Sequence, residues 1–322
     1  MSGETEVVLD RRRLRRGMSF WRAAALIILL IAGGLLLQSH EDLAGFFGQK
    51  QVARVSITGT ITEDRDQLRL FKKIAKADYV KALLVYVNSP GGTTTGGEAI
   101  FEALREIAKK KPVVAQFGTV AASAGYITGL GADHIVARGN TITGSVGVLI
   151  QWPEVHELLN KIGVKMQTIR SGPMKAKPSP LEPLDDAGRQ IAQTMIMDGF
   201  EWFISLVEKR RNLTVANVPG LKLGSIYSGR KALELNLVDE IGGEETAISW
   251  LEKERGVTKD LEIIDWEPEK SGSWGGMGAL SGALTQLFGK SGAAFAKLLS
   301  RDQFVSSLGL DGLVSVWHPS EN

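Results

Sequence analysis

Three short segments of the chain combine small residues with polar groups that could do chemistry. They are Asn88–Gly92 (NSPGG), Gly118–Tyr126 (GTVAASAGY) and Ser171–Pro180 (SGPMKAKPSP). The adjacent glycines of the first segment let backbone N–H groups approach a ligand closely, as an oxyanion hole requires. A pair of glycines after a strand also fits an ordinary tight turn, so this segment needs support from the other two.

Ser123 in the second segment is the candidate nucleophile. It opens a stretch rich in Ala and Gly that we expect to be helical, with its hydroxyl near the positive end of the helix dipole. The N–H of Ala124 can face the same oxygen. A serine at this place is also a common N-cap, and the segment has no G-x-S-x-G nucleophile elbow. Ser123 therefore needs a nearby base before it can count as a nucleophile.

Histidine is a poor candidate for that base. The chain has no cysteine and only four histidines, at His40, His134, His156 and His318. His134 falls in a predicted strand and His156 in a predicted helix, so a Ser-His-Asp triad is the weaker option. No spacing of His, Asp and Glu predicts a metal site, and we expect neither a metal nor a cofactor.

Lys175 in the third segment is the candidate general base. A neutral amine accepts a proton without a third group to fix its tautomer, but it must be desolvated, because water favours the ammonium form. Ser145 in Thr143–Gly147 (TGSVG) is a candidate to orient that amine by a hydrogen bond. Lys177 lies close by and is a rival base on sequence alone.

The elements that must position these residues alternate between short β-branched runs and helical stretches. Residues 52–58, 82–87 and 113–117 read as strands, and residues 96–110 and 185–211 as helices. This alternation predicts a mostly parallel sheet with crossover helices. The chain has 322 residues, 43% of them hydrophobic, which is enough to bury a large core. A formal net charge of +2 gives no sign of a nucleic-acid partner.

The N-terminus carries a membrane signal. Residues 11–16 hold five arginines, and residues 23–37 are uncharged and apolar. We interpret residues 1–17 as a cytoplasmic basic tail, 18–38 as a single transmembrane anchor and 39–50 as a linker. A cleaved secretory signal is the alternative, but no A-x-A-like site follows. Either reading places the rest of the chain outside the cytoplasm. Residues 266–322 are rich in Gly and Ser and predict a loosely folded tail.

Five motifs together resemble one known family. They are NSPGG at 88–92, AASAGY at 121–126, TGSVG at 143–147, SGPMKAKPSP at 171–180 and YSGRKALELNLVDEIG at 227–242. In this order they are similar to the bacterial signal peptide peptidase A family, in its short single-copy form. The resemblance covers residues 51–255 and implies a crotonase-like α/β fold related to the Clp protease, with residues 51–265 as the peptidase domain.

The resemblance also implies a role for each candidate residue. It makes Ser123 the nucleophile and Lys175 the base, because only Lys175 has the family spacing after Ser-Gly. It places Ser145 beside the lysine and the Gly92 N–H in the oxyanion hole. Ala124 departs from the family, which usually has glycine there, but the backbone donor is retained.

The function implied is that of a Ser-Lys serine endopeptidase of the bacterial inner membrane. Its catalytic domain would face the periplasm, assemble as a ring-like homo-oligomer and degrade released signal peptides and other unstructured apolar peptides. Two alternatives remain from the residues themselves. The crotonase fold also supports acyl-CoA enzymes, and an inactive membrane scaffold could bind peptides without cleaving them.

Overall fold

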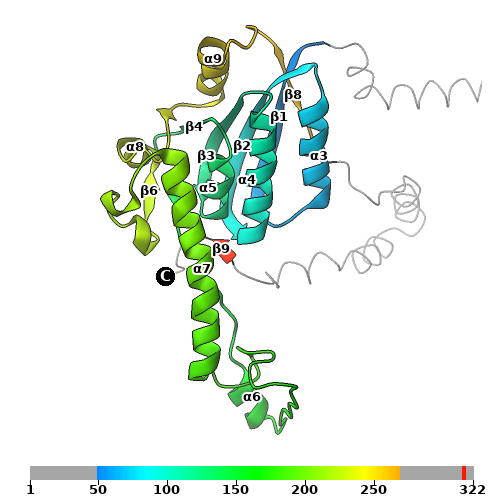
Figure 1. Ribbon diagram of the computed structural model, residues 1–322, viewed down its shortest axis with the longest axis vertical. Coiled ribbons are helices and arrows are strands. Elements are labelled where there is room, and N and C mark those ends of the chain that lie inside the picture. Colours follow the sequence, from blue (N-terminus) through cyan, green and yellow to red (C-terminus); the bar gives the residue numbers. More distant parts are fainter. Residues whose placement is uncertain (1–48, 269–313, 317–322) are drawn as a thin grey trace, which may run out of the picture. The chain divides into compact units, whose positions relative to one another are not determined.

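The computed structural model describes residues 49–268 and 314–316 (Figure 1). The predicted anchor at 18–38 and most of the predicted tail lie outside the described residues. Within the described ranges, no helix is long and apolar enough to cross a membrane. The account below concerns the unit that begins at Gln51.

A mostly parallel sheet forms the centre of this unit. Its main strands are β1 (Gln51–Ile61), β2 (Val80–Thr93), β3 (Val113–Ala122) and β8 (Glu262–Asp265). The path runs β6-β5-β3-β2-β1-β8, and every pair along it is parallel except β5 with β6. The predicted parallel sheet is therefore confirmed.

Side chains along β2 point alternately to the two faces of the sheet, and different helices cover each face. Leu83, Val85 and Val87 point into a core formed with α3 (Arg65–Lys76), α4 (Thr94–Ala108) and α5 (Ala124–Leu130). Ala82 and Leu84 point the other way, into a smaller core under α9 (Glu244–Arg255). Because both faces are covered, the strand is hydrophobic at every position from Ala82 to Val87.

The remaining elements are short and lie around the edge of the sheet that holds β4 to β7. They are β4 (His134–Ala137), β5 (Ile142–Gly144), β6 (Ile226–Ser228), β7 (Glu240–Ile241), α8 (Gly229–Glu234) and the 3-10 turns Val215–Asn217 and Leu221–Leu223. β4 pairs with both β3 and β7.

The long helix α7 (Asp186–Arg211) is anchored to the sheet unit only by its C-terminal half. Phe203 and Val207 are buried there, and Arg210 donates two hydrogen bonds of 2.8 Å to the carbonyls of Leu130 and Ala132, at the C-terminal end of α5. The N-terminal half extends away from the sheet and carries α6 (His156–Lys161) at its far end (Figure 1). We call residues 156–198 the distal arm.

The chain departs from the sequence prediction where β2 ends. The expected strand stopped at residue 87, because Asn-Ser-Pro-Gly-Gly is typical of a turn. The observed strand runs through this motif to Thr93 after a register shift between Val87 and Ser89. It continues because it keeps neighbours on both sides, β1 on one and β9 (Val314–Val316) on the other. No strand was expected in the tail, and β9 is one.

Close packing between α5 and the sheet gives a test of the fold. A Cβ added at Gly129 would lie 2.3 Å from Cζ of the buried Phe117 ring. We expect Gly129→Ala to lower the free energy of unfolding by about 1–2 kcal/mol, since overpacking of ~1–3 kcal/mol outweighs a gain of up to ~1 kcal/mol in helix propensity.

The measurement is the midpoint of chemical denaturation. Gly172→Ala is the matched control, because a Cβ there meets nothing within 4 Å. An unchanged or higher midpoint for Gly129→Ala would show that this contact is not tight.

Candidate active site

Ser123 lies at the sharp turn between β3 and α5. Its backbone has φ 58° and ψ −119°, and the residue is only 1% exposed. Its N–H donates a 2.9 Å hydrogen bond to the carbonyl of Gly144 in β5. Ser123 occupies the N-cap position of α5, but its side chain makes no capping bond to the helix. The simple capping role that the sequence left open is therefore not observed.

The conformation of Ser123 is costly for a residue with a side chain. A non-glycine residue in a sparsely populated backbone region costs of order 1–3 kcal/mol, and such residues gather at active sites. A serine on a strained turn from strand to helix is also the geometry of a nucleophile elbow. The sequence did not reveal this turn, because the G-x-S-x-G pattern is absent.

Ser145 is brought close to this turn. β3 pairs with β5 up to Ala122 opposite Gly144, so Ser145 is the next residue beyond the pair. It also has a positive φ, 52°, and its N–H donates to the carbonyl of Ser225 at 2.9 Å. The structure thus places Ser145 and Ser123 on neighbouring strand ends.

The glycine segment also meets the start of α5. Ser89 pairs with Ala121 of β3, and a Cβ on Gly125 would lie 2.8 Å from the Ser89 carbonyl oxygen. Gly92 has a packing reason of its own to be glycine, because a Cβ there would lie 1.8 Å from the Ile61 carbonyl oxygen. The residue type alone therefore does not identify an oxyanion donor.

Two polar side chains that sequence reasoning passed over hold this region together. Ser89 Oγ is buried, accepts the Gly91 N–H at 3.1 Å and donates to the Gly91 carbonyl at 3.2 Å. Asn88 Oδ1 accepts the N–H groups of Thr119 and Val120 at 3.1 and 3.2 Å. Both belong to the NSPGG motif, so their polarity next to the glycines was the available signal.

Neither described histidine belongs to this site. His134 begins β4 and stacks on Trp250 with ring centroids 4.6 Å apart, and its Nε2 lies 3.3 Å from Glu240. His134 lies beside the start of the parallel strand β3, and Ser123 follows the end of β3. The two residues therefore lie at opposite ends of the strands. His156 lies in α6 on the distal arm. A Ser-His pair is not formed by the part of the chain that the structure describes.

The two candidate lysines lie on the distal arm. Lys175 is exposed, in the loop that joins α6 to α7, and Figure 1 shows α6 at the end of α7 that is remote from α5. A single chain therefore does not bring Lys175 to Ser123. Lys177 is engaged elsewhere, since its ammonium pairs with the Asp185 carboxylate. That hydrogen bond is the main reason why the pKa of Asp185 is lowered. Lys177 thus has a structural partner within the loop, and Lys175 stays the candidate base.

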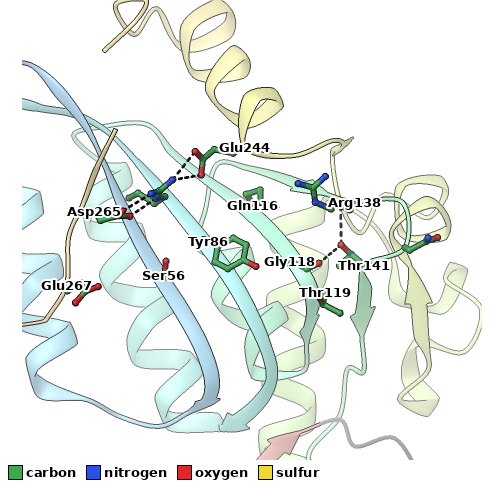
Figure 2. Close-up of a pocket in the computed structure, with 12 residues that line it drawn as sticks. Ser56, Tyr86, Gln116, Gly118, Thr119, Arg138, Thr141, Glu244, Asp265 and Glu267 are labelled. Atoms are coloured by element: carbon green, nitrogen blue, oxygen red, sulfur yellow. Dashed lines mark hydrogen bonds and ion pairs between the residues drawn. The ribbon is translucent and has the colours of Figure 1, made fainter. Parts of the chain in front are cut away.

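A hollow lies on the opposite face of the sheet from α5 (Figure 2). It has a volume of about 780 Å³ and is lined by polar groups that include Ser56, Tyr86, Gln116 and Arg138. The Arg54 guanidinium at its rim contacts Glu244 at 2.9 Å and lowers the pKa of Asp265 through a hydrogen bond. None of the predicted site residues lines it. Across the described ranges, no three His, Asp or Glu side chains form a metal cluster.

Two family models match this chain. The model of peptidase family S49 matches residues 105–258, and that of the Clp protease family matches residues 52–141. A putative protease of Synechocystis is 37% identical over 219 residues, which cover 67% of this chain and 79% of the relative. A putative signal peptide peptidase SppA of Enterococcus faecium is 33% identical over 253 residues, covering 73% of each chain.

Among solved structures, a ClpP1 variant from Listeria monocytogenes covers 60% of this chain and 93% of its own, with 17% identity and a TM-score of 0.41. The Clp protease model covers the segment from β1 to β4, which holds the serine turn and the glycine segment. The match to this family model identifies the fold as a Clp-protease-like α/β fold. From the relatives that it matches over most of their length, this chain is a peptidase and belongs to family S49, the signal peptide peptidase A family.

Proposed function

We propose that this peptidase is a membrane-anchored serine endopeptidase with Ser123 as nucleophile and Lys175 as general base. The observation that carries the proposal is the backbone of Ser123, buried and strained at the β3–α5 turn without capping the helix. A purely structural serine gains nothing from that conformation, whereas a nucleophile gains a fixed direction of attack.

The reaction is acyl transfer in two steps. The neutral amine of Lys175 takes the Ser123 hydroxyl proton as Oγ attacks the peptide carbonyl carbon. The N–H groups of Gly92 and Ala124 stabilise the oxyanion that forms, each worth about 3–4 kcal/mol of barrier by analogy with other oxyanion donors. The C–N bond then breaks, the leaving amine receives the proton from Lys175, and water hydrolyses the acyl-enzyme. Ser145 orients the lysine amine from the neighbouring strand end.

A single chain supplies only part of this site, so we infer that a neighbouring chain supplies Lys175. The distal arm holds eight of the thirteen exposed large hydrophobic side chains found in the described residues. Ile162 is 65% exposed and Ile169 fully exposed there. Apolar side chains gathered on a surface that also carries the base mark a contact with another protein. A second copy of the chain would cover them and desolvate the amine, which the base requires.

The proposed substrates are unstructured apolar peptides, signal peptides released after export among them. A relative that covers 73% of this chain carries the name of a signal peptide peptidase. The apolar segment at residues 18–38 would place the catalytic domain beside the membrane where such peptides accumulate. The proposed location is the bacterial inner membrane, with the catalytic domain on the periplasmic side.

Removing the nucleophile tests the proposal most directly. We expect Ser123→Ala to lower the rate of hydrolysis of an unstructured apolar peptide at least ~10⁴-fold, because no other group can form the acyl-enzyme. A fluorophosphonate should label the native chain and not this variant. Ser205→Ala is the matched control, since Ser205 lies on an exposed face of α7 and its Oγ bonds to its own helix. Unchanged turnover by Ser123→Ala would end the proposal.

The two lysines give a second prediction. Lys175→Met should lower kcat at least ~10³-fold, and Lys175→Arg should not restore it because a guanidinium stays protonated. Lys177→Met, which only breaks the pair with Asp185, should keep activity within several-fold. Equal losses at both positions would mean that the lysine loop matters for its shape and not for its base.

A shared site also predicts complementation between inactive chains. When Ser123→Ala and Lys175→Met chains are co-assembled in equal amounts, about a quarter of the sites combine an intact serine with an intact lysine. We expect activity near that fraction of the native value, measured on purified mixed assemblies. No recovery from assemblies shown to be mixed would place both groups of one site in the same chain.

Asn88 tests the support of the glycine segment. Asn88→Ala leaves the Thr119 and Val120 N–H groups without their acceptor, and we expect a loss of about 1–3 kcal/mol in unfolding free energy together with a lower kcat. Asn88→Asp keeps an acceptor oxygen in place and should lose less of both. Denaturation and steady-state kinetics measure the two effects, and equal losses in the two variants would contradict the role of the acceptor.

A further inference from the structure

The hollow of Figure 2 lies over the part of the sheet face that α9 leaves open. α9 packs on this face near the starts of the strands, where Leu84 and Val114 are buried. Two positions further along the strands, the side chains on the same face are the polar Tyr86 and Gln116. Parallel sheets are normally covered on both faces by apolar packing, so an open polar stretch in the middle of one is unusual.

The polar side chains form one row across three neighbouring strands. Ser56 of β1 lies opposite Tyr86 of β2, and Tyr86 lies opposite Gln116 of β3. Gln116 is only 4% exposed, and its Nε2 donates a 2.9 Å hydrogen bond to the Phe117 carbonyl. The hydroxyls of Ser56 and Tyr86 make no hydrogen bond within the described part of the chain. The row thus offers hydrogen-bonding groups to a polar ligand.

The two ends of the hollow carry opposite charge. The groups at one end are Arg54, Glu244, Asp265 and Glu267. Arg54 pairs with Glu244 and Asp265, so three carboxylates face one guanidinium and two negative charges remain in excess. At the other end, the guanidinium of Arg138 is exposed and pairs with no carboxylate of the described residues (Figure 2). A ligand that matches both ends has a cation at one end and a carboxylate at the other.

The span of the hollow corresponds to a short peptide. Glu267 follows β8 and Arg138 follows β4, and the strands β1, β2 and β3 lie between them. Neighbouring strands are roughly 4.8 Å apart, so the two backbone positions are about 19 Å apart across the sheet. An extended peptide advances about 3.3–3.6 Å per residue, so roughly five or six residues bridge this span. A volume of about 780 Å³ lies within the usual range for a ligand site.

We propose that this hollow is a second binding site of the peptidase, for short peptides with both termini free. The peptide carboxylate lies on Arg138, whose guanidinium can donate two parallel N–H bonds to it. The peptide amino group lies among the excess carboxylates near Glu267. The hydroxyls and the amide of the row bond to the peptide backbone between these ends. Peptide-bond hydrolysis produces ligands of this kind, because each cleavage leaves one new carboxylate and one new amino group.

Calorimetry on the full-length Ser123→Ala chain tests the charged contacts without hydrolysis. We expect penta-alanine with free termini to bind, and amidation of its C-terminus to weaken binding about fivefold, the upper strength of an exposed ion pair. Arg138→Gln should weaken binding of the free peptide equally and should abolish the effect of amidation. Acetylation of the N-terminus should act in the same way through Glu267→Gln. Arg65→Gln is the matched control, since it removes the same charge from an exposed residue at the start of α3, on the other face.

A single thiol in the hollow locates the bound peptide. The chain has no cysteine, so Thr119→Cys in the same Ser123→Ala background introduces one reactive group at the lining of the hollow. Penta-alanine should slow the modification of this thiol by a maleimide in proportion to the fraction of sites that calorimetry shows to be occupied. The thiol introduced by Ser205→Cys, on the exposed face of α7, should react at the same rate with and without peptide.

Three results would overturn the proposal: no binding of penta-alanine, an effect of amidation that is equal with and without Arg138→Gln, or no protection of the thiol at position 119. Each of them is the result expected if the peptide binds only beside Ser123 or if a second copy of the chain covers this face. None of them touches the proposed function, because hydrolysis that depends on Ser123 is measured separately in the native chain. Conversely, a native chain without hydrolysis leaves the binding measurements on the Ser123→Ala chain valid.

Discussion

The architecture of this site depends on one short departure from the sheet. β3 leaves β2 after Ala121 and turns at Ser123, and the hydrogen bond from the Ser123 N–H to the Gly144 carbonyl holds the turn at a positive φ. Such a backbone persists only where its surroundings fix it. Here they do so through contacts that tolerate no side chain: a Cβ on Gly125 would press against the Ser89 carbonyl, and one on Gly92 against that of Ile61. The strained backbone of Ser123 therefore requires small residues at these neighbouring positions.

The division of the site between chains follows from where α7 is anchored. Arg210 and Arg211 fix its C-terminal end. Arg210 donates to carbonyls at the C-terminal end of α5, and Arg211 pairs with Asp239 at 2.7 Å, so this end is continuous with the core around the serine. The other end lies beside α6, away from the same core, and the loop between α6 and α7 holds Lys175. A buried base needs a dry environment, and an exposed loop cannot provide one alone. The exposed apolar side chains of the distal arm are what a partner chain would use to exclude water.

Sequence reasoning predicted the parts of the fold that hydrophobic periodicity controls. The parallel sheet, α4 and α7 were expected near their observed bounds. The pattern of apolar residues in the sequence indicates both the buried strands and the apolar face of α4. The extension of β2 through Pro90 and the glycines was missed, since it depends on neighbours distant in sequence. The strained backbone of Ser123 and the acceptor role of Asn88 were missed for the same reason: each is set by tertiary contacts, while local chemistry suggests a cap and a turn.

A peptidase that recognises extended backbone faces a general difficulty with its own sheet. It must keep an edge with unpaired N–H and C=O groups, and such an edge also pairs with other chains and promotes aggregation. Proteins commonly cover such edges with charged residues, proline or a short strand of their own. In this chain the edge is formed by Gly91–Thr93, which offer no charge, and it is covered by the three residues of β9.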